Sequence, residues 1–189
     1  MTKNILLVGV GGQGTILASK LLTTGLMEEG YDVKMSEIHG MSQRGGNVSS
    51  QVRYGEKVEA PVIEIGSADV IVAFEKMEAL RALEYIKPDG LVVVNDVEIE
   101  SMPILSGKFD YPQDIIEILE SKVKTIVVEA SKHAKELGNS KVMNIILLGT
   151  IIKSMKLEHI NWEKIIKDNV KPNFVEINIK ALELGKSLV

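Results

Sequence analysis

A glycine-rich turn near the N-terminus has the spacing of an anion-binding site. The stretch GVGGQG places Gly9, Gly11 and Gly14 in a G-x-G-x-x-G pattern. It follows an apolar run, residues 4–8, that predicts a buried strand, and it opens a segment with helical periodicity. Glycines let backbone N–H groups approach an anion at the positive end of a helix. The pattern predicts either a phosphate or dinucleotide cradle or a tight strand–helix junction that binds nothing. The cradle would consist of Gly11, Gly12, Gln13 and Gly14.

Two side chains bear on which anion such a cradle would take. A dinucleotide-binding unit usually has a ribose-gripping acid near the end of its second strand, and Glu37 has about that position. Gln13 argues the other way, because its long amide would project into the space that a pyrophosphate occupies. The residues therefore leave a dinucleotide site and a different anion site both open.

A second group of polar residues lies in SEIHGMSQRGGNVSSQVRYG, residues 36–55. Arg44 precedes two glycines, so its planar guanidinium stands on an uncrowded backbone and suits a carboxylate or a phosphate. His39 is the histidine of this segment, and histidine is a common acid–base side chain in catalytic sites, although an isolated histidine more often has a structural role. We expect this segment to line a pocket or to contact another subunit. The expected pocket or contact residues are Glu37, His39, Gln43, Gly45, Gly46, Asn47, Ser49, Gln51 and Arg53, with Arg44 as a phosphate contact.

Residues 47–55 alternate with the period of a strand. Val48, Ser50, Val52 and Tyr54 share one face. The opposite face is wholly polar and consists of Asn47, Ser49, Gln51 and Arg53. We expect that polar face to meet water or a polar partner.

The order of predicted elements indicates an α/β protein. Apolar runs at 4–8, 68–75, 91–96 and 124–130 predict buried strands, residues 31–37 predict a second strand after the first helix, and amphipathic segments alternate with the runs. The prediction is a Rossmann-like, mostly parallel sheet with helices on both faces and a C-terminal helical cluster. We expect a single domain over 1–189, with an α/β core to about residue 130 and helices from about 131.

Glu75, Asn95 and Glu129 end three of the predicted strands. Ligands of open parallel sheets gather at the carboxyl ends of the strands, so these residues are candidates to line a pocket. Glu75 has a second interpretation, because an acid at the start of a helix is favoured by the helix dipole.

Composition excludes several classes of function. The 189 residues contain no cysteine, which rules out disulfides, thiolate catalysis and an iron–sulfur cluster held by thiolates of this chain. A net charge of −4 and few aromatic residues give no sign of the basic surface and stacking side chains that nucleic-acid binding needs. No apolar run is long enough for a membrane span, and the histidines lack metal-binding spacing, so we expect a cytoplasmic protein without a metal site. No residue stands out as a general base or nucleophile.

The two motifs together resemble a known family. GVGGQG followed by HGMSQRGG and a polar strand with a V-R pair is similar to the gamma-type domain of the 2-oxoacid:ferredoxin oxidoreductases. Within that family, the residues before R-G-G resemble the small (beta) subunits of the indolepyruvate branch. ADVIVAFEKMEALRAL, NSKVMNIILLG and VEINIKALELG extend the resemblance over essentially the whole chain.

The resemblance implies a role within a complex. A large (alpha) subunit would hold thiamine diphosphate, magnesium and [4Fe-4S] clusters, and ferredoxin would accept the electrons of the oxidative decarboxylation of an aryl pyruvate to its acyl-CoA. This chain would hold no cofactor alone and would be inactive in isolation. Coenzyme A would contact it, if at all, at the interface.

Two other functions are compatible with the residues. The glycine pattern and Glu37 are also compatible with a free-standing NAD(P)- or FAD-binding oxidoreductase. The fold could also serve as a docking platform in a non-catalytic assembly protein.

Overall fold

The protein is built on one six-stranded sheet. The computed structural model describes residues 2–40 and 46–189, and the strand order is β2-β3-β1-β4-β5-β6. Strands β1, β2, β4, β5 and β6 run in one direction and β3 runs against them. The strands are β1 (Lys3–Val10), β2 (Asp32–His39), β3 (Asn47–Gly55), β4 (Ala68–Ala73), β5 (Ile86–Asn95) and β6 (Lys124–Val128).

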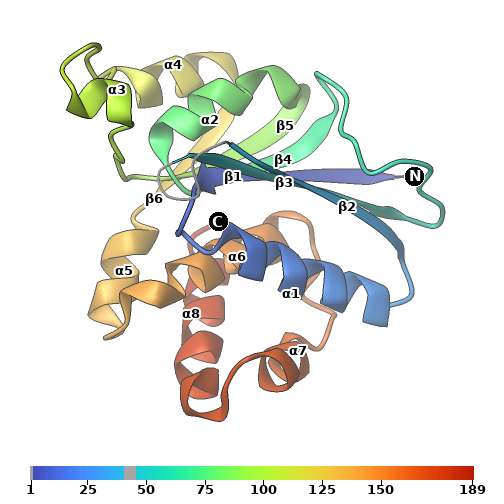
Figure 1. Ribbon diagram of the computed structural model, residues 1–189. Coiled ribbons are helices and arrows are strands. Elements are labelled where there is room, and N and C mark those ends of the chain that lie inside the picture. The colour runs from blue at the N-terminus through green and yellow to red at the C-terminus, as the bar shows by residue number, and fades with distance from the viewer. Residues whose placement is uncertain (1, 41–45) are drawn as a thin grey trace.

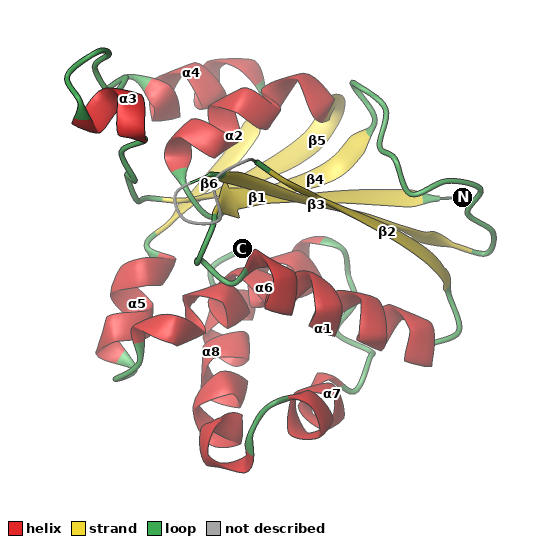
Figure 2. Cartoon of the chain, in the orientation of Figure 1, coloured by secondary structure: helices red, strands yellow, loops and turns green. Residues whose placement is uncertain are grey.

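Helices cover both faces of the sheet (Figures 1 and 2). One face carries α1 (Thr15–Glu28), α5 (Ala130–Glu136), α6 (Met143–Ser154), α7 (Trp162–Asn169) and α8 (Val175–Ser187). The other carries α2 (Lys76–Ala82) and α4 (Ile115–Lys122), and the short α3 (Met102–Leu105) lies in the connection between β5 and α4. Single 3-10 turns are η1 (Leu83–Tyr85), η2 (Ser140–Val142) and η3 (Pro172–Phe174). The predicted mostly parallel α/β sheet with a C-terminal helical cluster is confirmed.

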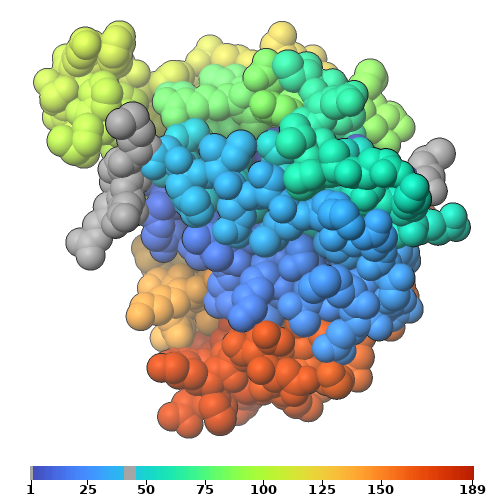
Figure 3. Space-filling model, turned by 45° about the vertical axis from the view of Figure 1, so that its right-hand side comes forward, coloured from blue at the N-terminus to red at the C-terminus, as the bar shows by residue number. Residues whose placement is uncertain are grey.

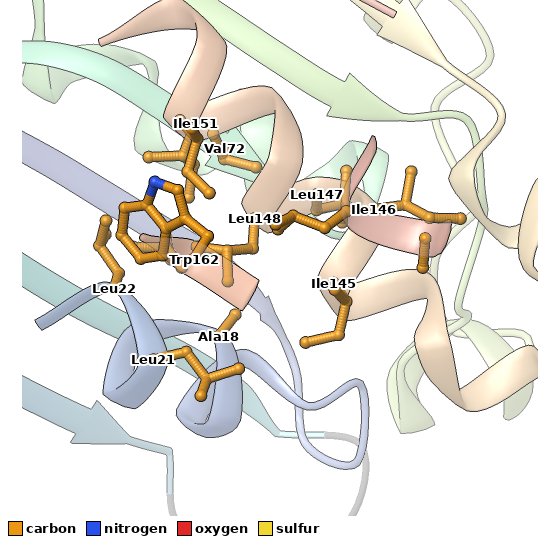
Figure 4. Close-up of a cluster of buried hydrophobic side chains, with 14 of the residues drawn as sticks. Ala18, Leu21, Leu22, Val72, Ile145, Ile146, Leu147, Leu148, Ile151 and Trp162 are labelled. Carbon is orange, nitrogen blue, oxygen red and sulfur yellow. The ribbon is translucent and has the colours of Figure 1, made fainter. Parts of the chain in front are cut away.

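The larger core lies between the sheet and the C-terminal helices. Helix α6, MNIILLGTIIKS, is apolar on almost every side, and it is buried between the sheet, α1 and α8 (Figure 4). Gly149 of α6 and Gly185 of α8 let these two helices approach so closely that a methyl group at Gly185 would overlap the carbonyl oxygen of Ile146. Within the described residues, no helix has the length and apolar character needed to cross a membrane.

The position of β3 departs from the predicted arrangement. The sequence predicts a βαβ unit in which residues 31–37 follow the first strand and its helix, as β2 does. In the structure, β3 lies between β1 and β2 and pairs antiparallel with both. Because β3 runs backwards, it begins at the edge where β1 and β2 end, with Asn47 opposite Val10. The reversal places both ends of the 40–46 connection at the carboxyl edge of the parallel strands.

The polar face of β3 is largely covered by the chain itself. Residues 56–67 fold over it, and the Gln51 Oε1 accepts a hydrogen bond of 2.6 Å from the Ile63 amide in a buried position. Arg53 donates to the carbonyl oxygens of Ala60 and Val62. The expectation that the whole face meets water or a partner is therefore wrong at Gln51, which the chain itself buries, whereas Arg53 is half-buried and bonded to local backbone groups. Ser49 is half-buried and Asn47 is exposed.

Candidate functional site

The glycine turn lies at the switch point of the sheet. Helix α1 follows β1 on one face, and α2 follows β4 on the other, so chain connections diverge between the carboxyl ends of these neighbouring strands (Figure 1). Ligands of open α/β sheets bind in this crevice. The turn, the start of α1 and both ends of the 40–46 connection meet here, which makes this edge the candidate site.

Two side-chain amides close the bottom of the crevice. Gln13 accepts a hydrogen bond of 2.7 Å from the Val10 amide and donates one of 2.8 Å to the Phe74 carbonyl oxygen. The buried Asn95 donates to the same carbonyl oxygen at 3.1 Å. A carbonyl oxygen has two lone pairs, and these two amides use both. Gln13 therefore folds back onto the strand ends and joins β1 to β4, so its side chain does not enter the space of a bound anion.

Backbone hydrogen bonds tie the turn to the 40–46 connection. The Gly11 amide donates to the Gly46 carbonyl oxygen at 2.9 Å, and the Gly40 amide donates to that of Asn47 at 2.8 Å. The Gly11 amide is thus already used within the chain, which leaves Gly12 and Gly14 as the part of the predicted cradle that faces open space. Gln43, Arg44 and Gly45 lie outside the described residues.

Gly14 positions the start of α1. Its φ of 83° lies in the left-handed region, and a methyl group there would overlap the Asn144 amide of α6. Asn144 donates to the Gly14 carbonyl oxygen at 3.2 Å. The first turn of α1 has neither an acidic residue nor a side-chain cap, so its partial positive charge is not offset locally.

Two hollows flank the turn. One, of about 630 Å³, lies between the start of α1 and the end of β2, and Gly12, His39 and Gly40 line it. The other, of about 520 Å³, lies on the opposite side of Gly12, where Lys141 and Asn144 line it. Lys141 and Asn144 were not among the sequence candidates. Asn144 is a polar residue within the apolar run VMNIILLG, and that contrast is the signal that could have identified it.

Glu37 is too far from the turn to serve as a ribose-gripping acid. It lies on β2, and β3 separates β2 from β1, so about two strand spacings, ~10 Å, intervene. Its carboxylate accepts a hydrogen bond from the Ser19 hydroxyl at 3.2 Å and lies 3.9 Å from the half-exposed His39 Nε2. Glu37 is thus a neighbour of His39, which lines the larger hollow.

A third hollow opens on the α2 side of β3. It measures about 230 Å³, and Asn47, Ser49, Gln51, Glu78 and Arg81 contribute to its lining. Burial, with help from the negative charge of Glu75, raises the pKa of Glu78 above its ordinary value, although its 2.6 Å ion pair with Arg81 opposes the shift. Glu78 therefore retains its proton to a higher pH than an exposed glutamate does.

Glu75 acts as a structural carboxylate. It is the N-cap of α2, where its Oε2 accepts from the Glu78 amide at 3.0 Å. Its Oε1 accepts from the Tyr111 hydroxyl and from the Ile99 amide. Of the two interpretations from sequence, the helix-start interpretation describes these contacts. In the described ranges, no group of three or more histidine or acidic side chains could hold a metal ion.

Comparison with known proteins identifies the family. A model of the pyruvate ferredoxin/flavodoxin oxidoreductase family matches residues 4–188. The chain belongs to this family. Relatives in it include the indolepyruvate oxidoreductase subunit IorB of Pyrococcus horikoshii, which is 38% identical over 96% of this chain and 93% of its own length. The IorB subunit of Thermococcus kodakarensis is 37% identical over the same shares.

Solved structures show the same fold. The gamma subunit of a keto/oxoacid ferredoxin oxidoreductase from Geobacter sulfurreducens matches with a TM-score of 0.75 at 22% identity, over 100% of this chain and 96% of that one. The 2-oxoglutarate:ferredoxin oxidoreductase from Magnetococcus marinus, solved with 2-oxoglutarate, coenzyme A and succinyl-CoA, matches with a TM-score of 0.74 at 20% identity. There the match covers 99% of this chain but 31% of the other, so the fold is one part of a longer polypeptide.

Proposed function

We propose that this chain is the small subunit of an indolepyruvate:ferredoxin oxidoreductase. The observation that carries the proposal is the 37–38% identity, over almost the entire length, to subunits named for that activity. In this proposal a large subunit holds thiamine diphosphate, magnesium and [4Fe-4S] clusters, and the complex passes electrons to ferredoxin. The absence of cysteine from the chain supports that division, because thiolates are the usual ligands of such clusters.

The chain's own contribution is to shape one wall of the reaction site. Thiamine diphosphate supplies the chemistry that decarboxylates a 2-oxoacid, and the protein around it supplies binding, orientation and exclusion of water. Gln13 and Asn95 both donate to the Phe74 carbonyl oxygen, and these two hydrogen bonds hold neighbouring strand ends together beneath that wall. Gly12, Gly14 and His39 line the open hollow.

The hollow at the start of α1 fits an anionic group. Nothing lies within 4 Å of the position that a methyl group would take on Gly12, so the backbone there is open to a close approach. The helix start adds partial positive charge with no acid in its first turn. We place coenzyme A at this side of the interface, with its phosphates toward Gly12 and Gly14 and with Arg44 as a further contact.

The geometry argues against a free-standing NAD(P)- or FAD-binding oxidoreductase. The Gly11 amide is occupied by the Gly46 carbonyl oxygen, and Glu37 is separated from β1 by β3. A dinucleotide site of this kind uses the backbone of its glycine turn for the pyrophosphate and places its acid within reach of the ribose.

Reconstitution with a large subunit tests the proposal. The small chain and its large subunit are co-expressed, purified under anaerobic conditions, and assayed for dye reduction with indolepyruvate, thiamine diphosphate and coenzyme A. We expect a stable complex with turnover, no turnover by the small chain alone, and a thermal shift of the complex with coenzyme A but not with NAD(P) or FAD. Failure of the two chains to associate, or turnover by the lone small chain, would refute the proposal.

A further inference from the structure

A long excursion follows β5 at the edge of the candidate site. Residues 96–114 connect β5 to α4, far more than the 2–6 residues that such a connection usually needs. Residues 97–110 of this excursion, which we call the knob, stand out from the body as the yellow-green lobe in Figures 1 and 3. The short helix α3 lies within this connection.

The knob exposes large apolar side chains. Met102, Leu105 and Phe109 are 73%, 62% and 61% exposed. Met102 and Leu105 are three positions apart in α3 and therefore share one side of its single turn. Exposed apolar residues that gather on one projecting segment are typical of a docking element, whereas singly scattered ones are ordinary on protein surfaces.

One buried carboxylate fixes the chain at the start of the knob and directly after its end. Glu75, which is 1% exposed, accepts a hydrogen bond of 3.2 Å from the Ile99 amide at the start and one of 2.5 Å from the Tyr111 hydroxyl after the end. The Tyr111 hydroxyl oxygen also accepts from the Met77 amide at 3.1 Å. Lys76 adds an ion pair of 2.6 Å to Glu98. The apolar side chains are thus presented on a base that is already ordered, which lowers the entropic cost of binding.

We propose that the knob docks into an apolar socket on the large subunit. This inference rests on the proposed function, which supplies the partner. The knob leaves the sheet at the same carboxyl edge as the glycine turn, and Val97 and Ile99 line the 520 Å³ hollow together with Gly12 and Gly14. A subunit that covers the turn therefore reaches the knob.

Matched substitutions test the docking role. Leu105→Asp and Phe109→Asp place a charge on the knob, and Ile65→Asp is the control because Ile65 is 68% exposed on the 56–67 segment at the opposite edge of the sheet. Tyr111→Phe removes the hydroxyl that fixes the chain directly after the knob and leaves the apolar side chains intact. Binding of each variant to the purified large subunit is measured by biolayer interferometry, and folding is measured by far-UV circular dichroism and thermal unfolding.

The inference predicts a graded result. Each knob variant should bind at least about tenfold more weakly than the wild-type chain while remaining folded, Ile65→Asp should stay within about twofold, and Tyr111→Phe should fall between them. Wild-type affinity in both knob variants would overturn the inference while leaving the proposed function intact. A wild-type chain that does not bind the large subunit at all would overturn both. Self-association of the wild-type chain that the knob variants abolish would assign the knob to a second copy instead.

Discussion

Gln13 illustrates how one residue can satisfy a motif and still have a different role. In G-x-G-x-x-G it occupies a variable position beside the ligand, yet its amide bridges Val10 and Phe74. We expect Gln13→Ala to lower the free energy of unfolding by about 1–3 kcal/mol, because it removes the side-chain partner of the Val10 amide and one of the two hydrogen bonds to the Phe74 carbonyl oxygen. Gln13→Glu should be no better, since a second carboxylate oxygen would face the Phe74 carbonyl oxygen.

Urea unfolding of these variants measures the effect. Gln113→Ala, at an exposed position, is the control and should change stability by less than about 0.5 kcal/mol. If Gln13→Ala unfolds like the wild-type chain but loses affinity for coenzyme A in the complex, Gln13 serves the ligand and not the strand ends.

Glu78 makes stability depend on pH. Burial raises its pKa in the folded chain above the unfolded value, so the folded state binds this proton more tightly. The stabilising contribution is fully present below the unfolded pKa and is lost as the pH rises through the raised folded pKa. At neutral pH the ionised side chain therefore weakens the fold.

Glu78→Gln should raise the melting temperature at pH 7–8, by on the order of 2 °C. The difference from the wild-type chain should shrink as the pH falls into the ordinary carboxyl range. The lost ion pair with Arg81 costs little, because the Arg81 side chain is half-exposed. Thermal unfolding between pH 4 and 8 measures this, with the exposed Glu120→Gln as the control. A variant that is equally destabilised at every pH would contradict the assignment.

At the scale of elements, the close contact between α6 and α8 decides whether a substitution at Gly185 raises or lowers the stability of the fold. Helix propensity alone predicts that Gly185→Ala stabilises α8 by about 1 kcal/mol. The structure predicts the opposite, a loss of about 3 kcal/mol, because the new methyl group would overlap the Ile146 carbonyl oxygen and force the helices apart. Chemical denaturation distinguishes the two, and Ser187→Ala, exposed on the same helix, should change stability by less than about 0.5 kcal/mol.

The sequence predicts where the helices and strands lie along the chain better than it predicts which strands pair with one another. Periodicity identifies the strands and helices, because alternation and helical spacing are local properties. It does not show that β3 inserts between β1 and β2, since pairing partners are chosen by contacts between distant segments. For the same reason, the alternation of β3 correctly predicts which residues share a face. It does not predict which segment of the chain covers each face. Residues 56–67 cover Gln51 and Arg53, and no local pattern announces that contact.

The candidate site shows the same division. Its position follows from the glycine motif and the rule that ligands gather at carboxyl strand ends. The proximity of residues 40 and 46 to the turn follows only from the reversed direction of β3. Asn144 joins the site from the C-terminal third, which no spacing rule connects to Gly14.

At the scale of the whole molecule, the two edges of the sheet differ in character. Toward the amino ends of the parallel strands, residues 56–67 cover part of the polar face of β3 and form hydrogen bonds with Arg53 and Gln51. The carboxyl edge holds the hollows beside Gly12 and leads to the knob. The chain itself therefore covers the amino end of the sheet, and the carboxyl end is the side on which we place the large subunit.

The bond between Gly14 and Asn144 also bears on the order in which the protein is made. The two residues are 130 positions apart, so the glycine turn leaves the ribosome long before the residue that braces it. The apolar underside of the sheet must likewise wait for α6 and α8 to be synthesised. A polypeptide interrupted before residue 144 would carry the glycine motif on a turn that lacks its Asn144 contact, beside an uncovered apolar surface. Quality-control proteases would be expected to remove such a fragment.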